Sequence, residues 1–116
     1  MHKFKELIVW QKAVDLAVET YKVTKKFPAD ERFGLTSQMN RCAVSVPSNI
    51  AEGAGRNTDG EFNHFLGVAT GSAFEFETQL IIASKLNIIN EEDFKQTGKG
   101  INEVQNMLFG LQKSLK

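Results

Sequence analysis

Cysteine and net charge are both scarce in this chain of 116 residues. The single cysteine, Cys42, excludes an intramolecular disulfide, so we expect a reducing, cytoplasmic setting. The 14 basic and 14 acidic side chains cancel, which disfavours strong attraction of the whole monomer to nucleic acid or to an anionic membrane. No run of about 18 apolar residues and no signal peptide occurs. These absences predict a single soluble domain, residues 1–116, with no membrane partner.

Motifs of common enzyme classes are also missing. The run Gly53-Ala54-Gly55-Arg56 follows no predicted strand, so it does not match a phosphate-binding or dinucleotide-binding loop. Glu61 and His64 have the Glu-x-x-His spacing of di-iron bundles, but His2 is the only other histidine and no second such pair exists. Cys42 has no motif that would activate it as a nucleophile. We therefore expect no catalytic residue, no metal site, no cofactor and no enzymatic activity.

What the sequence does contain is apolar residues at helical spacing. They recur every three or four positions in four segments, at about residues 8–26, 35–53, 59–87 and 91–115. Strand signals are scarce, since no turn dipeptide lies between alternating β-branched runs. The connections are short, which makes neighbouring helices antiparallel. The sequence predicts an all-α protein, an up-down-up-down antiparallel four-helix bundle.

The second of these segments contains an unusual run, Ser-Val-Pro-Ser-Asn-Ile-Ala-Glu-Gly, at residues 45–53. Proline inside a helix removes a backbone hydrogen bond and costs roughly 3 kcal/mol. Pro47 therefore needs compensation, either from packing or from the hydroxyls of Ser45 and Ser48.

Polar side chains of the second and third helices fall on flanks that an antiparallel hairpin brings to one side. With the turn near residues 57 and 58, Ser45 is expected level with Ser72, and Arg41 with Glu75, for which we predict an ion pair. Side chains such as Ser, Asn and Gln fix directional hydrogen bonds, which favours an organised or ligand-facing groove; an ordinary solvated face is the alternative. The predicted groove residues are Gln38, Arg41, Ser45, Asn49, Glu52, Arg56, Glu75 and Gln79.

A third direction on the third helix carries large apolar residues and two glycines four positions apart. Paired glycines allow close backbone approach, and exposed large apolar side chains are a liability on a monomer. Scattered exposed apolar residues without a role are the alternative reading. We predict an interface between copies of the chain that contains Gly67, Gly71, Phe74, Thr78 and Ile81, with Phe109 of the fourth helix.

Several motifs together resemble a known family. The runs Val9-Trp10-Gln11-Lys12-Ala13, Phe33-Gly34-Leu35, residues 45–53 and Glu77-Thr78-Gln79-Leu80 resemble the four-helix-bundle proteins encoded by intervening sequences of bacterial 23S ribosomal RNA genes. The resemblance covers nearly the whole chain. It implies a homopentamer around a central channel, and kinship to the accessory variability determinant of diversity-generating retroelements, which partners a reverse transcriptase and binds nucleic acid.

That kinship draws attention to the basic residues. Residues 1–28 hold six lysines and three acidic residues, and in a ring each cation would be repeated five times. The candidate phosphate contacts are Arg41, Arg56, Lys5, Lys12, Lys22, Lys25 and Lys26; for the lysines, a plain solvated face is the alternative. We expect an oligomeric scaffold or adaptor for ribosomal RNA, another nucleic acid, or a protein such as a reverse transcriptase. The alternative is a protein-interaction module that binds no nucleic acid.

Overall fold

Four long α-helices follow one another along the chain. The computed structural model describes residues 2–115, and within them no strand occurs. The two terminal residues of the predicted domain, 1 and 116, lie outside the described residues. The predicted helical segments are confirmed to within about two residues at each end. The elements are η1 (Phe4–Glu6), α1 (Ile8–Thr24), η2 (Ala29–Glu31), α2 (Leu35–Ala54), α3 (Asp59–Lys85) and α4 (Glu91–Ser114).

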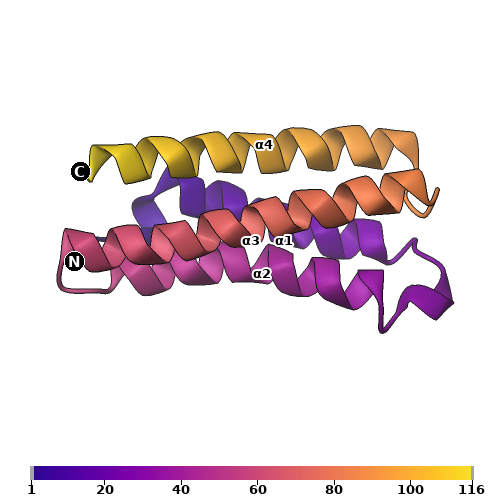
Figure 1. The fold of residues 1–116 in the computed structure, drawn as a ribbon, viewed down its shortest axis with the longest axis horizontal. Helices are drawn as coiled ribbons and strands as arrows, with labels where there is room; N and C mark the ends of the chain where they lie inside the picture. The colour runs from indigo at the N-terminus through magenta and orange to yellow at the C-terminus, as the bar shows by residue number, and fades with distance from the viewer. Residues whose placement is uncertain (1, 116) are drawn as a thin grey trace.

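The helices pack lengthwise as a four-helix bundle of 43 × 23 × 20 Å (Figure 1). α2 packs against α1 and α3, and α4 packs against the same two helices. Two polar pairs join α3 to α4 and two join α1 and the residues just after it to α4, and in each case the residue numbers rise on one helix as they fall on the other, so these helices are antiparallel. The Ser45–Ser72 and Cys42–Glu75 contacts show the same for α2 and α3, and the short connection makes α1 and α2 antiparallel as well. The pairs are Thr24–Asn40, Ser45–Ser72, Glu77–Gln105, Thr70–Gln112, Lys12–Glu103 and Lys26–Asp93.

Local signals define where the helices begin and end. Thr58 caps α3 by accepting a hydrogen bond from the Glu61 N–H, and Asn90 caps α4 in the same way through the Asp93 N–H. α3 ends in a Schellman motif: the N–H of Ile88 donates to the Ala83 carbonyl, while Asn87 has a left-handed φ of 58°. Asparagine tolerates this conformation better than most residues other than glycine.

α2 remains a continuous helix through Pro47. Pro47 is a buried residue of α2 on the side that faces Val14 and Ala17 of α1. The Ser45 hydroxyl is hydrogen-bonded to Ser72 and to the Asn49 amide, at 2.9 and 3.0 Å, so it does not serve the carbonyl that the proline frees. Of the two compensations considered, burial of the proline ring against α1 is the one that the structure supports.

The core runs the length of the bundle. Its largest fully buried side chains come from α2, α3 and α4, and full burial of each such apolar side chain contributes about 1.5–3 kcal/mol. They are Met39, Val46, Ile50, Phe62, Leu66, Phe76, Leu80, Ile101, Val104 and Leu108.

α2 and α3 approach each other closely at Gly53. A Cβ atom added there would lie 2.7 Å from the Phe65 Cβ and 3.2 Å from the Phe62 backbone oxygen. Both atoms belong to the frame of α3, so neither can move independently of the helix. The last residue of the Ser-to-Gly run therefore has a packing role.

We predict that Gly53→Ala lowers the free energy of unfolding by about 1–3 kcal/mol, because the methyl group overpacks the contact. Urea unfolding followed by circular dichroism measures this. Gly55→Ala is the matched control: an added Cβ there meets its nearest atoms at 3.6 and 3.7 Å, an ordinary contact, and its φ of −83° suits alanine. If the two variants had equal free energies of unfolding, the close approach of α3 would not be what requires glycine at position 53.

Candidate functional site

The structure brings most of the residues predicted for a polar groove together in one hollow, which we call the polar groove. It lies along α2 and α3, has a volume of about 490 Å³, and contains five of the eight predicted residues: Gln38, Arg41, Ser45, Glu75 and Gln79. The predicted level pairing of Ser45 with Ser72 is confirmed by a hydrogen bond of 2.9 Å. The sequence reasoning missed three other residues that line the polar groove, Phe33, Ser37 and Cys42.

The predicted ion pair between Arg41 and Glu75 is wrong. Both residues line the polar groove, but among residues 2–115 their charged atoms do not approach within 4.0 Å. Instead, the Cys42 thiol donates to the Glu75 carboxylate at 3.7 Å. α2 thus presents Cys42 toward Glu75. Both charged side chains are exposed, and an exposed pair gains only about 0.2–1 kcal/mol, too little to hold two long side chains together.

Gln79 gives the polar groove an unusual floor. Its side chain is only 9% exposed, and its Oε1 atom has no hydrogen-bond partner among residues 2–115. A buried acceptor left unpaired costs about 1–3 kcal/mol.

The remaining predicted groove residues lie beyond this hollow. Asn49 donates to the Ser45 carbonyl at 2.8 Å and so extends the polar row along α2. Glu52 and Arg56 form an ion pair of 3.4 Å with each other, and the Arg56 guanidinium lies 4.7 Å from the centre of the Phe65 ring. Near the turn into α3, these two residues serve the hairpin rather than the groove.

The thiol of Cys42 is half-buried in the wall of the polar groove. Burial raises the pKa of Cys42; an interaction with Gln79 opposes this in part, and the Glu75 carboxylate raises it further. Its net pKa is above the ordinary value, which keeps the thiol protonated at neutral pH. This fits a packed cysteine better than an activated nucleophile.

The lysines predicted as phosphate contacts divide into two groups. Lys12 is paired with Glu103 at 3.0 Å and so links α1 to α4, and Lys26, just after the end of α1, is paired with Asp93 of α4 at 2.9 Å. The hydrogen bond and charge of Asp93 raise the pKa of Lys26. Lys5 is an exposed residue of η1, while Lys22 and Lys25 lie beside a second hollow.

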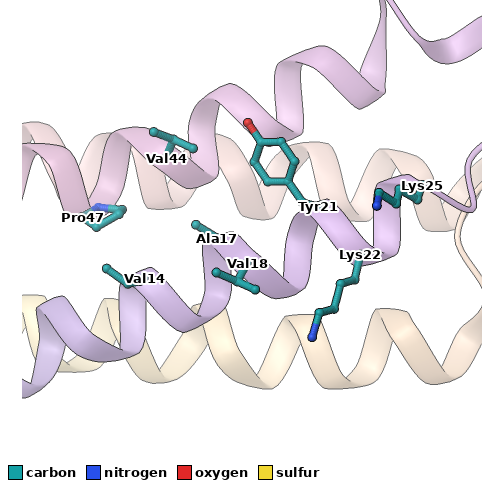
Figure 2. A pocket seen from close by; sticks show the side chains of 8 residues that line it. All are labelled: Val14, Ala17, Val18, Tyr21, Lys22, Lys25, Val44 and Pro47. Carbon is teal, nitrogen blue, oxygen red and sulfur yellow. The ribbon is translucent and has the colours of Figure 1, made fainter.

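This second hollow, which we call the apolar groove, was not predicted. It lies between α1 and α2 and has a volume of about 410 Å³ (Figure 2). Its lining residues are Val14, Ala17, Val18, Tyr21, Val44 and Pro47, with Lys22 and Lys25 beside them. The sequence did contain a sign of the apolar groove. The apolar residues of α1 extend around more of the helix than α2 and α4 cover.

α3 is apolar on its solvent side as well as on its core side. Phe74 is 56% exposed, and Val68, Ile81 and Ile82 of the same helix are also exposed. The outer face of α3, as we call it, comprises Gly67, Val68, Gly71, Phe74, Thr78, Ile81 and Ile82, all exposed. It contains five of the six residues predicted for self-association. The sixth, Phe109 of α4, is 68% exposed.

The residues weighed for metal chemistry have structural roles. Glu61 takes part in the cap of α3, with its carboxylate accepting from the Thr58 hydroxyl. The Nε2 atom of His2 lies 3.3 Å from the Oδ1 atom of Asp59, and the His2 ring packs against the Phe62 ring. Within residues 2–115, no group of three or more His, Cys, Asp or Glu side chains is placed to hold a metal ion. In the same residues, none of the helices has the length and apolar character needed to cross a membrane.

The protein is a four-helix bundle that carries a polar groove, an apolar groove and an exposed apolar helix face. The family model described as 23S rRNA-intervening sequence protein matches residues 5–110. The chain therefore belongs to this family, as its motifs indicated.

A solved structure supports the same fold. It is the crystal structure at 1.70 Å resolution of a protein of unknown function from the S23 ribosomal protein family of Bacteroides thetaiotaomicron VPI-5482. The two superpose with a TM-score of 0.85 at 22% identity, over 91% of this chain and 96% of that one. No curated protein matches the sequence.

We predict that Cys42 reacts with iodoacetamide more slowly at pH 8 than free cysteine does, because its raised pKa leaves less thiolate. Glu75→Gln removes a charge that opposes the thiolate, so it lowers the pKa and speeds the reaction by roughly twofold to tenfold. The pH profile of the alkylation rate measures both effects. Glu92→Gln, on α4, is the control and leaves the profile unchanged. A wild-type profile that matches free cysteine would contradict the account of the thiol.

Proposed function

We propose that this protein is a non-enzymatic scaffold that assembles into a homopentamer and holds a partner at its polar surfaces. Ribosomal RNA or another nucleic acid is the leading partner. The observation that carries the proposal is the outer face of α3, because exposed apolar residues that share one helix face are a liability on a monomer.

Self-association is supported by the large apolar side chains that the single chain leaves exposed. Phe74, Ile81 and Phe109 each leave a large apolar surface in water. Gathered apolar residues of this size on a soluble protein usually mark an interface. The family resemblance supplies the number of copies, five.

Binding of nucleic acid is supported by a third hollow, at the start of α2, which adjoins both the polar groove and the apolar groove. Phe33 is 88% exposed, and the guanidinium of Arg32 lies 5.3 Å from the centre of its ring. Arg41 lines the same hollow. An exposed aromatic ring with two arginines provides a stacking surface and phosphate contacts for an unpaired base. In a ring of five copies this cluster would recur five times.

A protein-only module is the second candidate function, and the family resemblance points to a reverse transcriptase as one partner. It is favoured by the ion pairs of Lys12, Lys26 and Arg56, which occupy three of the seven predicted phosphate contacts with acidic side chains of the same chain. Fewer free cations mean a smaller electrostatic contribution to nucleic-acid binding.

We predict that the purified protein has the mass of five copies of its 13.0 kDa chain. Sedimentation equilibrium or light scattering during gel filtration measures this at micromolar concentration. A chain that remains a monomer at all accessible concentrations would overturn the scaffold proposal, because the apolar surface would then have no homotypic partner.

We predict that fragments of 23S ribosomal RNA bind the assembled protein with an affinity that falls steeply as salt is raised. Arg41→Ala and Phe33→Ala each weaken binding, by roughly tenfold, through loss of a phosphate contact and of a stacking surface. Fluorescence anisotropy at several salt concentrations measures this. Lys95→Ala is the control, since Lys95 on α4 is paired with Glu91 and lines neither the polar groove nor the hollow beside Phe33. Salt-insensitive capture of a protein, without RNA binding at low salt, would favour the second candidate.

A further inference from the structure

The bundle carries two exposed apolar features of complementary form, a helix face and a groove. Resting on the proposed self-association, we infer that the outer face of α3 in one copy docks into the apolar groove between α1 and α2 of the next copy. The contact is then head-to-tail, because each copy offers a different surface on its two sides. An amphipathic helix laid in an apolar groove is a recurring mode of protein recognition.

The two features match in chemistry. The walls of the apolar groove are aliphatic, with Val14 and Val18 on α1 and Val44 and Pro47 on α2 (Figure 2). Val18 is 52% exposed in the single chain, which is comparable to the 56% of Phe74 on the outer face of α3. Each feature exposes apolar surface that the other would cover.

The two features also lie at the same level along the bundle. The Thr24–Asn40 hydrogen bond sets the register of α1 against α2, so Tyr21 lies level with residue 43. The Ser45–Ser72 hydrogen bond sets α2 against α3, so Val44 lies level with residue 73, next to Phe74. The middle of the apolar groove and the middle of the outer face therefore share one height. A pure rotation about an axis parallel to the bundle would therefore bring the outer face of one copy against the apolar groove of the next. Because no translation along the axis is needed, repeated copies can close into a ring.

Charge supports the same pairing. Glu75 is the charged residue that adjoins Phe74 on α3, and no Lys or Arg occurs between Gly67 and Ser84. Lys22 and Lys25 lie beside the apolar groove. By the same registers, Lys22 is level with Cys42, whose thiol contacts Glu75. Glu75 borders the outer face, so in the proposed contact it and Lys22 of the next copy carry opposite charges at equal height.

Gly71, on the outer face of α3, leaves room for a second backbone. An added Cβ at Gly71 would meet no atom within 4 Å, so the single chain has no steric need for glycine there. Glycine inside a helix is less stable than alanine. A second backbone packed against this position would require the small residue.

The test mixes two variants that each lack one surface. Phe74→Asp spoils the outer face, and Val18→Asp spoils the apolar groove; both positions are about half exposed, and circular dichroism verifies that the variants stay helical. Each variant alone is expected to be monomeric. Mixed in equal amounts at high concentration, they are expected to form a one-to-one dimer through the single intact pairing, detected by sedimentation velocity. Ile8→Asp, 59% exposed but outside the groove, is the control and assembles like the wild type.

A second variant pair tests the close approach without adding a charge. Gly71→Ala is expected to weaken assembly by roughly tenfold or more in dissociation constant, while leaving the helical content unchanged. Gly110→Ala is the matched control. It lies on α4, is exposed, and an added Cβ there also meets no atom within 4 Å. It is expected to leave assembly unchanged.

The outcomes separate the two proposals. A wild-type monomer overturns the proposed self-association and this pairing with it. A wild type that assembles, with variants that do not complement each other, overturns the pairing alone. The pairing is also overturned if either Asp variant assembles by itself, which would indicate a contact between identical surfaces, or if Gly71→Ala assembles as tightly as Gly110→Ala.

Discussion

The close packing of α2 on α3 is the contact on which the rest of the molecule depends. It needs a residue without a side chain at Gly53, where the α3 backbone passes within van der Waals contact. The Ser45–Ser72 hydrogen bond then holds the same two helices in register. These two points fix which side chains of the hairpin share a level. The polar groove on one flank and the height of the outer face of α3 both follow from that register.

The fold could be predicted because its signals are local and mutually consistent. The apolar residues of all four helices recur at helical spacing, and Thr58 and Asn90 cap the helices that they precede. Helical-wheel reasoning also placed Ser45 level with Ser72, since an antiparallel hairpin has only one register once its turn is known. Helical spacing and hairpin register follow from backbone geometry, which does not depend on the conformations of the side chains.

The details of the candidate site were harder to predict because they depend on side-chain conformation and on cover from other helices. Arg41 and Glu75 share a groove without pairing, since exposed long side chains gain little from one fixed geometry. The apolar groove was missed because Val14 and Tyr21 belong to a stripe that looks like ordinary core. Only the packed bundle shows that α2 and α4 leave part of that stripe uncovered.

The first helix and the last are also neighbours, joined by Lys12–Glu103 and Lys26–Asp93. The four helices therefore form a closed circuit in which each one has a partner on both sides. No helix can leave without uncovering the core side of two others, so partial unfolding of any one of them destabilises the remainder. Because the circuit closes only through contacts about 70 to 90 positions apart in sequence, most of the chain must be in place before its apolar interior is sealed from water.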